Sequence, residues 1–452
     1  MIRLGAGAAA TLVLAGCASF SPDGSFDHVA ALTRERTGQP VVWQRSAEQA
    51  HAAQARVAEL LAQPLSADSA AEIALLNNAG LQARFADLGI AEADYVQAAR
   101  PSGPAIGLER IAGGGVAELT RSLTFNLIDL LRLPALGQLG RQRFEQAQFR
   151  AALEAVGVAA EARRAYFAAV AAQDRVNYAV QVQQAAEGTA ELARGMAAAG
   201  NFSALSQMRE QAFYDDATTQ LARTRLQATT ERERLARVLG LWGPQLAFRL
   251  PARLPDLPAQ PLVPQDAEAT AIAQRLDVQL AQRQALATAR ALGLTQATRY
   301  VDVFDLGYVD KRSTGSPTLR GAQAGVVLPL FDFGSARVAR ARAEYLQSVQ
   351  HTAEVAVNAR SQVREAYAAY RTAFDLARHY RDDVVPLRQR IAQENQLRYN
   401  GMLISVFELL ADAREQVAGV TGYIDALRDF WIADSNLRDA LTGGSTAPGA
   451  AR

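Results

Sequence analysis

The sequence is nearly without lysine, cysteine and histidine, and each shortage excludes a class of protein. Lys311 is the only lysine, and the 47 basic side chains are balanced by 46 acidic ones. Without a basic excess, the chain has no electrostatic basis for binding nucleic acid. The four histidines are scattered and the one cysteine is alone. We therefore expect neither a metal site nor an intramolecular disulfide.

The motifs of common enzyme classes are missing as well. The chain contains no phosphate-binding loop, no dinucleotide fingerprint and no nucleophile elbow. No segment has the roughly 20 consecutive apolar residues of a membrane-spanning helix. We therefore predict a protein that is not an enzyme, holds no cofactor, and would cross a membrane only with β-strands.

The N-terminus has the features of a secretion signal: a basic start, a short apolar run, and small residues before Cys17. The tetrad Leu14–Cys17 resembles the lipobox of bacterial lipoproteins. That resemblance implies cleavage before Cys17 and acylation of its thiol, for example with palmitate. Ala18 stands where inner-membrane lipoproteins carry aspartate, which implies an outer-membrane destination. The alternative is a secretion signal that contains a cysteine by chance.

The chain contains two copies of one unit, offset by about 200 residues. Arg163–Tyr166 aligns with Arg364–Tyr367, and Gly200–Asn201 aligns with Asn400–Gly401. The constant spacing of such pairs indicates an internal repeat. Five prolines in Pro251–Pro264 exclude a helix or a central strand between the copies. The predicted boundaries are a signal peptide 1–16, a lipidated tether 17–70, a first repeat 71–245, a proline-rich linker 246–266, a second repeat 267–442 and a disordered tail 443–452.

Each copy predicts a medium helix, two strands, a very long helix, a turn and another long helix. In the second copy the medium helix is expected at 267–297, the strands at 300–309 and 321–330, and a polar loop at 311–320. Strands of about 10 residues joined by a polar loop are typical of outer-membrane barrel hairpins. The first copy predicts a weaker, glycine-rich hairpin with strands at 105–111 and 118–128.

The longest predicted helix follows Gly334 and extends to about Arg398. Two rows of seven-residue spacing run along it, and nine of their ten positions are apolar or aromatic, as in the seam of a left-handed coiled coil. An ordinary bundle of long helices is the alternative. The rows are Leu346, Ala353, Arg360, Tyr367 and Phe374, and Val349, Ala356, Val363, Tyr370 and Ala377; Ala152, Ala155, Ala159, Ala162, Tyr166 and Ala169 continue the pattern in the first copy.

Over about residues 71–441 these motifs resemble one family, the TolC-like outer-membrane factors. Ala74–Leu81 is similar to the family's opening motif, and Arg275–Val278 to its counterpart in the second copy. Arg100–Pro104 and Leu328–Gly334 are similar to the segments that join helix and barrel. Proline ends a strand, aspartate caps a helix and glycine permits a close approach. The residues expected at these transitions are Pro101, Pro104, Pro329, Asp332 and Gly334.

Two further stretches, Ala199–Gln207 and Tyr399–Ala413, resemble the family's helix turns at the periplasmic tip, where the adaptor docks and the pore is gated. Glycine is expected to let the chain reverse, and serine to cap the returning helix. The tip residues are Gly200, Asn201, Ser203, Gly401 and Ser405.

Glu408 matches a position where the family often places a pore-facing acid, and a ring of three such acids would favour cations. The sequence departs from the family at Ala411, because the second acid, Asp412, comes one residue later and is rotated by about 100° on a helix. Arg398 and Tyr399 are candidates for hydrogen bonds to a neighbouring helix that hold the tip closed. The alternative for the acids is a solvated helix surface.

The resemblance implies a mainly helical homotrimer in the outer membrane of a Gram-negative bacterium. Four strands per protomer would close a twelve-stranded barrel, and the long helices would form a coiled-coil barrel in the periplasm. The implied function is a passive exit duct of a tripartite efflux system, whose partners are a periplasmic adaptor, an inner-membrane pump and outer-membrane lipid. The alternatives are a duct for type I protein secretion and a lipid-anchored periplasmic scaffold or adaptor without a pore.

Overall fold

The structure is a computed structural model that describes residues 19–263, 266–300, 303–327, 331–401, 403–404 and 406–443, with 406–413 described in backbone only. The predictions for Cys17, Pro329 and Ser405, and for the side chains of Glu408 and Asp412, therefore lie outside the described residues. No described helix is long and apolar enough to cross a membrane.

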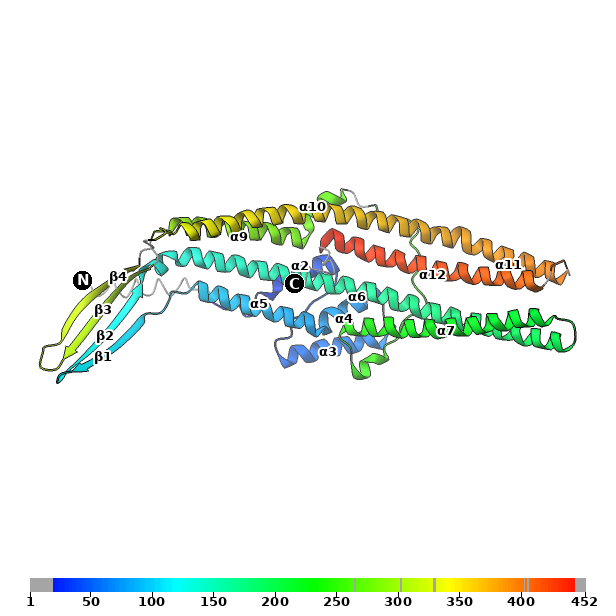
Figure 1. Ribbon diagram of the computed structural model, residues 1–452, viewed down its shortest axis with the longest axis horizontal. Helices are drawn as coiled ribbons and strands as arrows, with labels where there is room; N and C mark the ends of the chain where they lie inside the picture. The colour runs from blue at the N-terminus through cyan, green and yellow to red at the C-terminus, as the bar shows by residue number, and fades with distance from the viewer. Residues whose placement is uncertain are drawn as a thin grey trace. The chain divides into compact units, whose positions relative to one another are not determined.

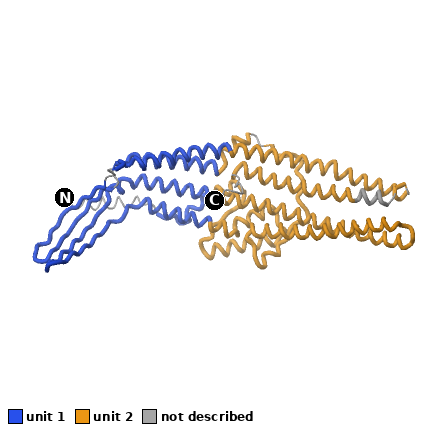
Figure 2. Tube along the Cα trace, in the orientation of Figure 1, with its two compact units in different colours: residues 1–29, 84–151, 277–357 blue, residues 30–83, 152–276, 358–452 orange. Residues whose placement is uncertain are grey.

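The chain divides into two compact units, and each unit takes segments from both halves of the sequence (Figure 2). Unit 1 consists of residues 1–29, 84–151 and 277–357, and unit 2 consists of residues 30–83, 152–276 and 358–452. The helices α6 (Leu127–Ala198) and α10 (Ser335–His379) contribute to both. The units therefore cut across the repeat in the sequence.

Unit 1 contains one antiparallel sheet in the order β1-β2-β3-β4 (Figure 1). Its strands are β1 (Ala105–Gly113), β2 (Val116–Asn126), β3 (Val303–Ser313) and β4 (Leu319–Val327). The glycine-rich first hairpin forms because Gly114 and Gly115 both adopt positive φ, as a two-residue hairpin turn requires. The two hairpins join where β2 pairs with β3.

The predicted loop at 311–320 is wrong for half of its residues. Residues 311–313 belong to β3 and residues 319–320 to β4, so that only 314–318 connect the strands. The reason is long-range pairing: Lys311 lies opposite Thr120, and Ser313 lies opposite Glu118. Polar residues that look like a loop in the sequence thereby gain the backbone partners of a strand.

The helices of unit 1 pack through small side chains and aromatic rings. They are α5 (Ala79–Ala98), the start of α6, α9 (Leu276–Ala297) and the start of α10. Tyr95 of α5 stacks on Phe144 of α6, and the guanidinium of Arg283 lies 3.8 Å from the ring centre of Phe149. The hydroxyls of Thr288 and Ser348, on α9 and α10, are 2.6 Å apart.

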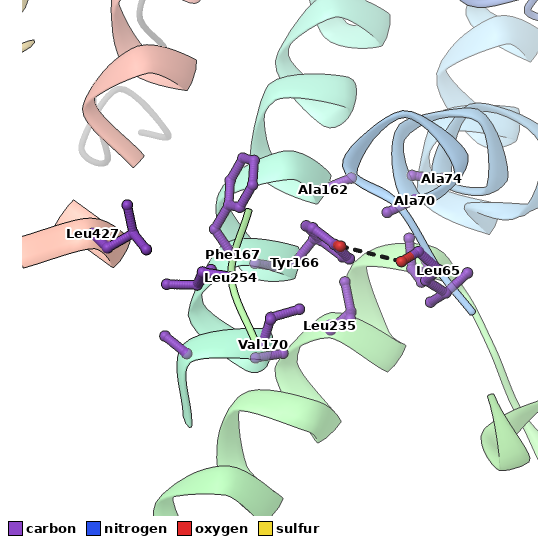
Figure 3. Packing of buried hydrophobic residues seen from close by; sticks show 14 of the residues in the cluster. Leu65, Ala70, Ala74, Ala162, Tyr166, Phe167, Val170, Leu235, Leu254 and Leu427 are labelled. Atoms are coloured by element: carbon purple, nitrogen blue, oxygen red, sulfur yellow. Dashed lines mark hydrogen bonds between the residues drawn. The ribbon is translucent and has the colours of Figure 1, made fainter. Parts of the chain in front are cut away.

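Unit 2 holds the main hydrophobic core. Its further helices are α2 (Phe26–Thr37, shared with unit 1), α3 (Ala47–Ala62), α4 (Ala67–Asn77), α7 (Ala204–Leu239), α8 (Ala267–Gln274), α11 (Val385–Asn400) and α12 (Val406–Thr442), with a 3-10 turn at Gly243–Ala247. The six seam positions predicted in the first copy are all buried. Tyr166 in this row donates its hydroxyl to the Leu65 carbonyl over 3.1 Å (Figure 3). The proline-rich segment packs on the same core through Leu254 and Leu257.

Two predicted helices are interrupted. The helix expected from Gly334 to Arg398 has a π-helical turn at Tyr380–Val384, where Val385 N–H donates to the carbonyl of Tyr380. Pro386 lacks an N–H group and its ring conflicts with a regular α-helical turn, so the helix widens just before it. The helix expected at 267–297 breaks at Arg275, which has extended backbone. Arg275 is buried and donates to the Ala440 carbonyl and to Gln362 Oε1.

Candidate functional site

The sheet of unit 1 has two chemically different faces. Side chains alternate along each strand, and the pairing register aligns them across all four strands. On one face Ile106 and Leu108 are 81% and 74% exposed. We call this the apolar face. Its apolar members are Ile106, Leu108, Leu119, Leu123, Phe125, Phe304, Leu306, Tyr308, Ala322, Ala324 and Val326.

The opposite face, here the polar face, carries mostly small and hydrophilic side chains, with apolar exceptions such as Ile111, Val309, Leu319 and Val327. Lys311 Nζ lies 2.5 Å from Glu118 Oε1 on neighbouring strands. A β-carbon on Gly107 would lie 2.4 Å from Ser122 Oγ, so a larger residue there would force the Ser122 hydroxyl to rotate. The remaining polar members include Glu109, Thr120, Thr124, Asp305 and Gln323. Such a sheet suits a hydrophobic environment on one side and water on the other.

The turn from β4 into α10 is built around Asp332 and Gly334. Asp332 accepts hydrogen bonds from the N–H groups of Gly334 (3.0 Å) and Ala336 (3.3 Å), which confirms its capping geometry. These bonds hold the pKa of the Asp332 carboxyl below its ordinary value, and the bond from Gly334 has the largest effect. Gly334 has φ +71°. At the other transition, Pro101 and Pro104 lie between the end of α5 and the start of β1.

The hairpin of α6 and α7 turns at Gly200 and Asn201. Gly200 has φ +79°, and Asn201 N–H donates to the Met196 carbonyl over 2.9 Å. Ser203 caps α7, because its hydroxyl accepts from the N–H of Ser206. This is the glycine-turn and serine-cap geometry expected from the sequence.

The second hairpin turns differently. Gly401 has φ −81°, so the chain does not reverse there through a left-handed glycine as it does at Gly200. The chain reverses instead with Leu403 N–H donating to the Arg398 carbonyl over 2.8 Å. Because φ −81° is open to most residues, glycine is not required at 401 by backbone conformation.

No family model and no curated protein matches the chain. Solved structures do match it. The Campylobacter jejuni CmeC outer membrane channel is 14% identical with a TM-score of 0.72, covering 84% of this chain and 86% of that one. The outer-membrane channel OprN is 18% identical with a TM-score of 0.70, covering 95% and 98%. The open state of the Neisseria gonorrhoeae MtrE outer membrane channel is 16% identical with a TM-score of 0.70, covering 86% and 89%.

The chain has the fold of outer-membrane channels. The predicted fold class, long helices with four strands in one chain, is thereby confirmed. The resemblance that was drawn from short sequence motifs is therefore confirmed at the level of the fold.

The residues expected from the sequence to form a gate lie on α11 and α12. Glu408 and Asp412 fall within the first two turns of α12. Arg398 Nε donates to Glu394 Oε1 of its own helix over 3.2 Å, and Tyr399 is half-buried. A bond from Arg398 or Tyr399 to a neighbouring helix therefore stays a prediction.

Sequence reasoning missed a buried acid near this end of unit 2. Glu210 of α7 is only 2% exposed, and its Oε2 lies 3.7 Å from Arg414 Nη2 of α12. Burial raises the pKa of the Glu210 carboxyl, and the charge of Arg414 opposes that shift. The signal was present, because Glu210 falls on the same helical stripe as the buried residues Ser206, Ala217 and Leu221.

Among the described residues, no group of three or more histidine, cysteine, aspartate or glutamate side chains is arranged to hold a metal ion.

Proposed function

We propose that this protein is a passive exit duct in the outer membrane of a Gram-negative bacterium and serves a tripartite efflux system. The observation that carries the proposal is the two-faced sheet within the fold of outer-membrane channels. The apolar face would contact lipid and the polar face would line the lumen. The edges β1 and β4 need partners, since lipid does not tolerate open sheet edges. Three copies would close a twelve-stranded barrel.

The exposed seam of α10 supports this assembly. Leu346 and Val349 are 52% and 37% exposed, whereas Val363 and Tyr370 farther along α10 are buried in unit 2. An apolar helix stripe left open in one chain is a natural contact for another copy. We therefore propose a homotrimer with a coiled-coil barrel of long helices.

The helix turns complete the proposal. The turns at Gly200, Asn201, Ser203, Gly401 and Ser405 would dock a periplasmic adaptor, and Glu408, Asp412, Arg398 and Tyr399 would form the gate. The adaptor would connect the duct to an inner-membrane pump, which selects the small molecules or ions exported. Cys17 would carry the lipid anchor, and the boundaries of signal, tether, repeats, linker and tail are those given from the sequence.

The test is the molar mass and conductance of the full-length protein extracted from outer membranes in detergent. A trimer that forms channels in planar bilayers is expected. A monomer without conductance would favour a lipid-anchored periplasmic scaffold.

A matched pair of variants sharpens the test. Leu108→Asp places a charge on the apolar face and should abolish membrane assembly, because charges in the bilayer are costly. Glu109→Gln changes the next residue, on the polar face, and should leave assembly intact. Equal assembly of both variants would contradict the assigned faces and thus the duct.

A further inference from the structure

The apolar face ends in four arginines on the side of the hairpin turns. Arg121 lies opposite Leu108 and Asp310, and Asp310 lies opposite Arg320. In the next row toward the turns, Leu119 lies between Arg110 and Arg312. All four arginines therefore share the face that carries Ile106 and Phe125. We call Arg110, Arg121, Arg312 and Arg320 the arginine rim.

The rim has a surplus of positive charge. Asp310 is the one acid in these two rows, and its carboxylate oxygens lie 3.4 Å from Arg312 Nε and from Arg320 Nε. Arg110 and Arg121 are exposed, and no ion pair to either is found among the residues that the structure describes. Four arginines against one aspartate leave three uncompensated positive charges per chain.

The rim lies at the expected height of lipid headgroups. Tyr308 belongs to the row just below Asp310, and the exposed aromatic residues Tyr300, Phe331 and Phe333 lie at the opposite end of the second hairpin. The described part of β3 from Val303 to Asp310 covers seven residue steps, about 23 Å of strand, or about 18 Å across a membrane at a tilt of about 40°. The strand below the rim therefore covers most of the roughly 25 Å apolar band of an outer-membrane barrel, and the exposed aromatic residues lie beyond its far end.

We propose that the arginine rim binds the phosphate groups of a phosphorylated lipid headgroup in the leaflet that surrounds the hairpin turns. The inference rests on the proposed insertion of the sheet into the outer membrane. Guanidinium groups bind phosphate oxygens in a forked geometry that lysine does not offer. Neighbouring strands are about 4.8 Å apart, so rim arginines on β1, β2, β3 and β4 are spaced to share one headgroup.

The experiment measures binding of a bis-phosphorylated glycolipid, and of the same glycolipid without its phosphates, to the full-length protein in detergent. Arg110→Gln/Arg121→Gln should weaken binding of the phosphorylated lipid about 30-fold, at the usual strength of basic residues near anionic lipid. The matched control is Arg225→Gln/Arg237→Gln, which removes two exposed arginines from α7 and should change binding less than twofold. The single variant Arg320→Gln, expected to weaken binding about fivefold, replaces the double variant if that fails to assemble.

The outcomes separate the two proposals. Equal affinity of the wild type for both glycolipids, or unchanged binding by the rim variants, overturns the rim while a conducting trimer leaves the duct intact. A wild type that neither assembles nor conducts overturns both.

Discussion

Gly334 lies so close to the backbone of Arg299 that a β-carbon on Gly334 would be 2.4 Å from the Arg299 carbonyl oxygen. Its φ of +71° is also unfavourable for a residue with a side chain. We expect Gly334→Ala to destabilise unit 1 by about 2–3 kcal/mol, measured by denaturant unfolding. Gly157→Ala in α6 is the control: nothing lies within 4 Å of its β-carbon. It should be stabilising by about 0.5–1 kcal/mol. Similar effects of both would contradict the close contact.

Tyr166 offers a pH-dependent test of the core in unit 2. Burial raises the pKa of its phenol to about 12, and its hydroxyl donates to the Leu65 carbonyl. Since the folded pKa is raised, the contribution to stability is fully present below the unfolded pKa of about 10 and is lost as pH rises through about 12. Tyr166→Phe should cost about 1 kcal/mol near pH 7 and remove this alkaline decline. Unfolding curves that decline equally in wild type and variant would contradict the assignment.

Glu210 should weaken unit 2 at neutral pH. Because burial raises its pKa above the ordinary 4.5, its contribution is most favourable below pH 4.5 and declines as pH rises through the folded pKa. Glu210→Gln should therefore be more stable than the wild type at pH 7 to 8, with the difference vanishing near pH 4. Arg414→Gln removes the opposing charge and should destabilise more at pH 8 than at pH 4. Differences that do not change with pH would contradict the burial of the charge.

The Lys311–Glu118 pair is expected to matter for ions more than for stability. The side chains are 43% and 29% exposed, so their coupling in a double-mutant cycle should be below about 1 kcal/mol. In the proposed lumen, Lys311→Gln leaves the acids of the polar face in excess. Reversal potentials in planar bilayers should then shift toward cation selectivity, and Glu118→Gln should shift them the other way. Shifts of the same sign would place the pair outside the lumen.

Glu408 is the proposed pore-facing acid of the gate. Three copies of a carboxylate around one axis attract cations, so Glu408→Ala should reduce cation selectivity or raise the frequency of open states. Asp412→Ala, one helical turn later, should have the smaller effect, because its position is rotated relative to the family pattern. Single-channel recording measures both quantities. Unchanged selectivity and gating in Glu408→Ala would remove the acid ring from the proposal.

Much of the architecture was predictable because it depends on local chemistry. Glycine and serine at Gly200 and Ser203 define a turn and a cap wherever they occur between two helices, and the structure has both. Asp332 caps the helix beside it for the same reason. Apolar residues at coiled-coil spacing correctly predicted the buried alanine row of α6. Residues at this spacing lie on one side of a helix, whatever segment packs against that side.

Some of the features that sequence reasoning missed depend on distant residues. The extension of β3 to Ser313 requires β2, almost 200 residues earlier, as a hydrogen-bonding partner. The position of Glu210 on the buried stripe of α7 could be read from the sequence, but its pairing with Arg414 of α12 could not.

The sequence by itself determined the long helices, the positions of most turns and the alternation of each strand, because propensity, capping and periodicity act within a few residues. Only the tertiary structure decided which strand faces align, where the helices break, and which charges are buried. Register and burial arise from contacts between segments far apart in the chain, so the arginine rim and the Lys311–Glu118 pair exist only once β1 to β4 are paired.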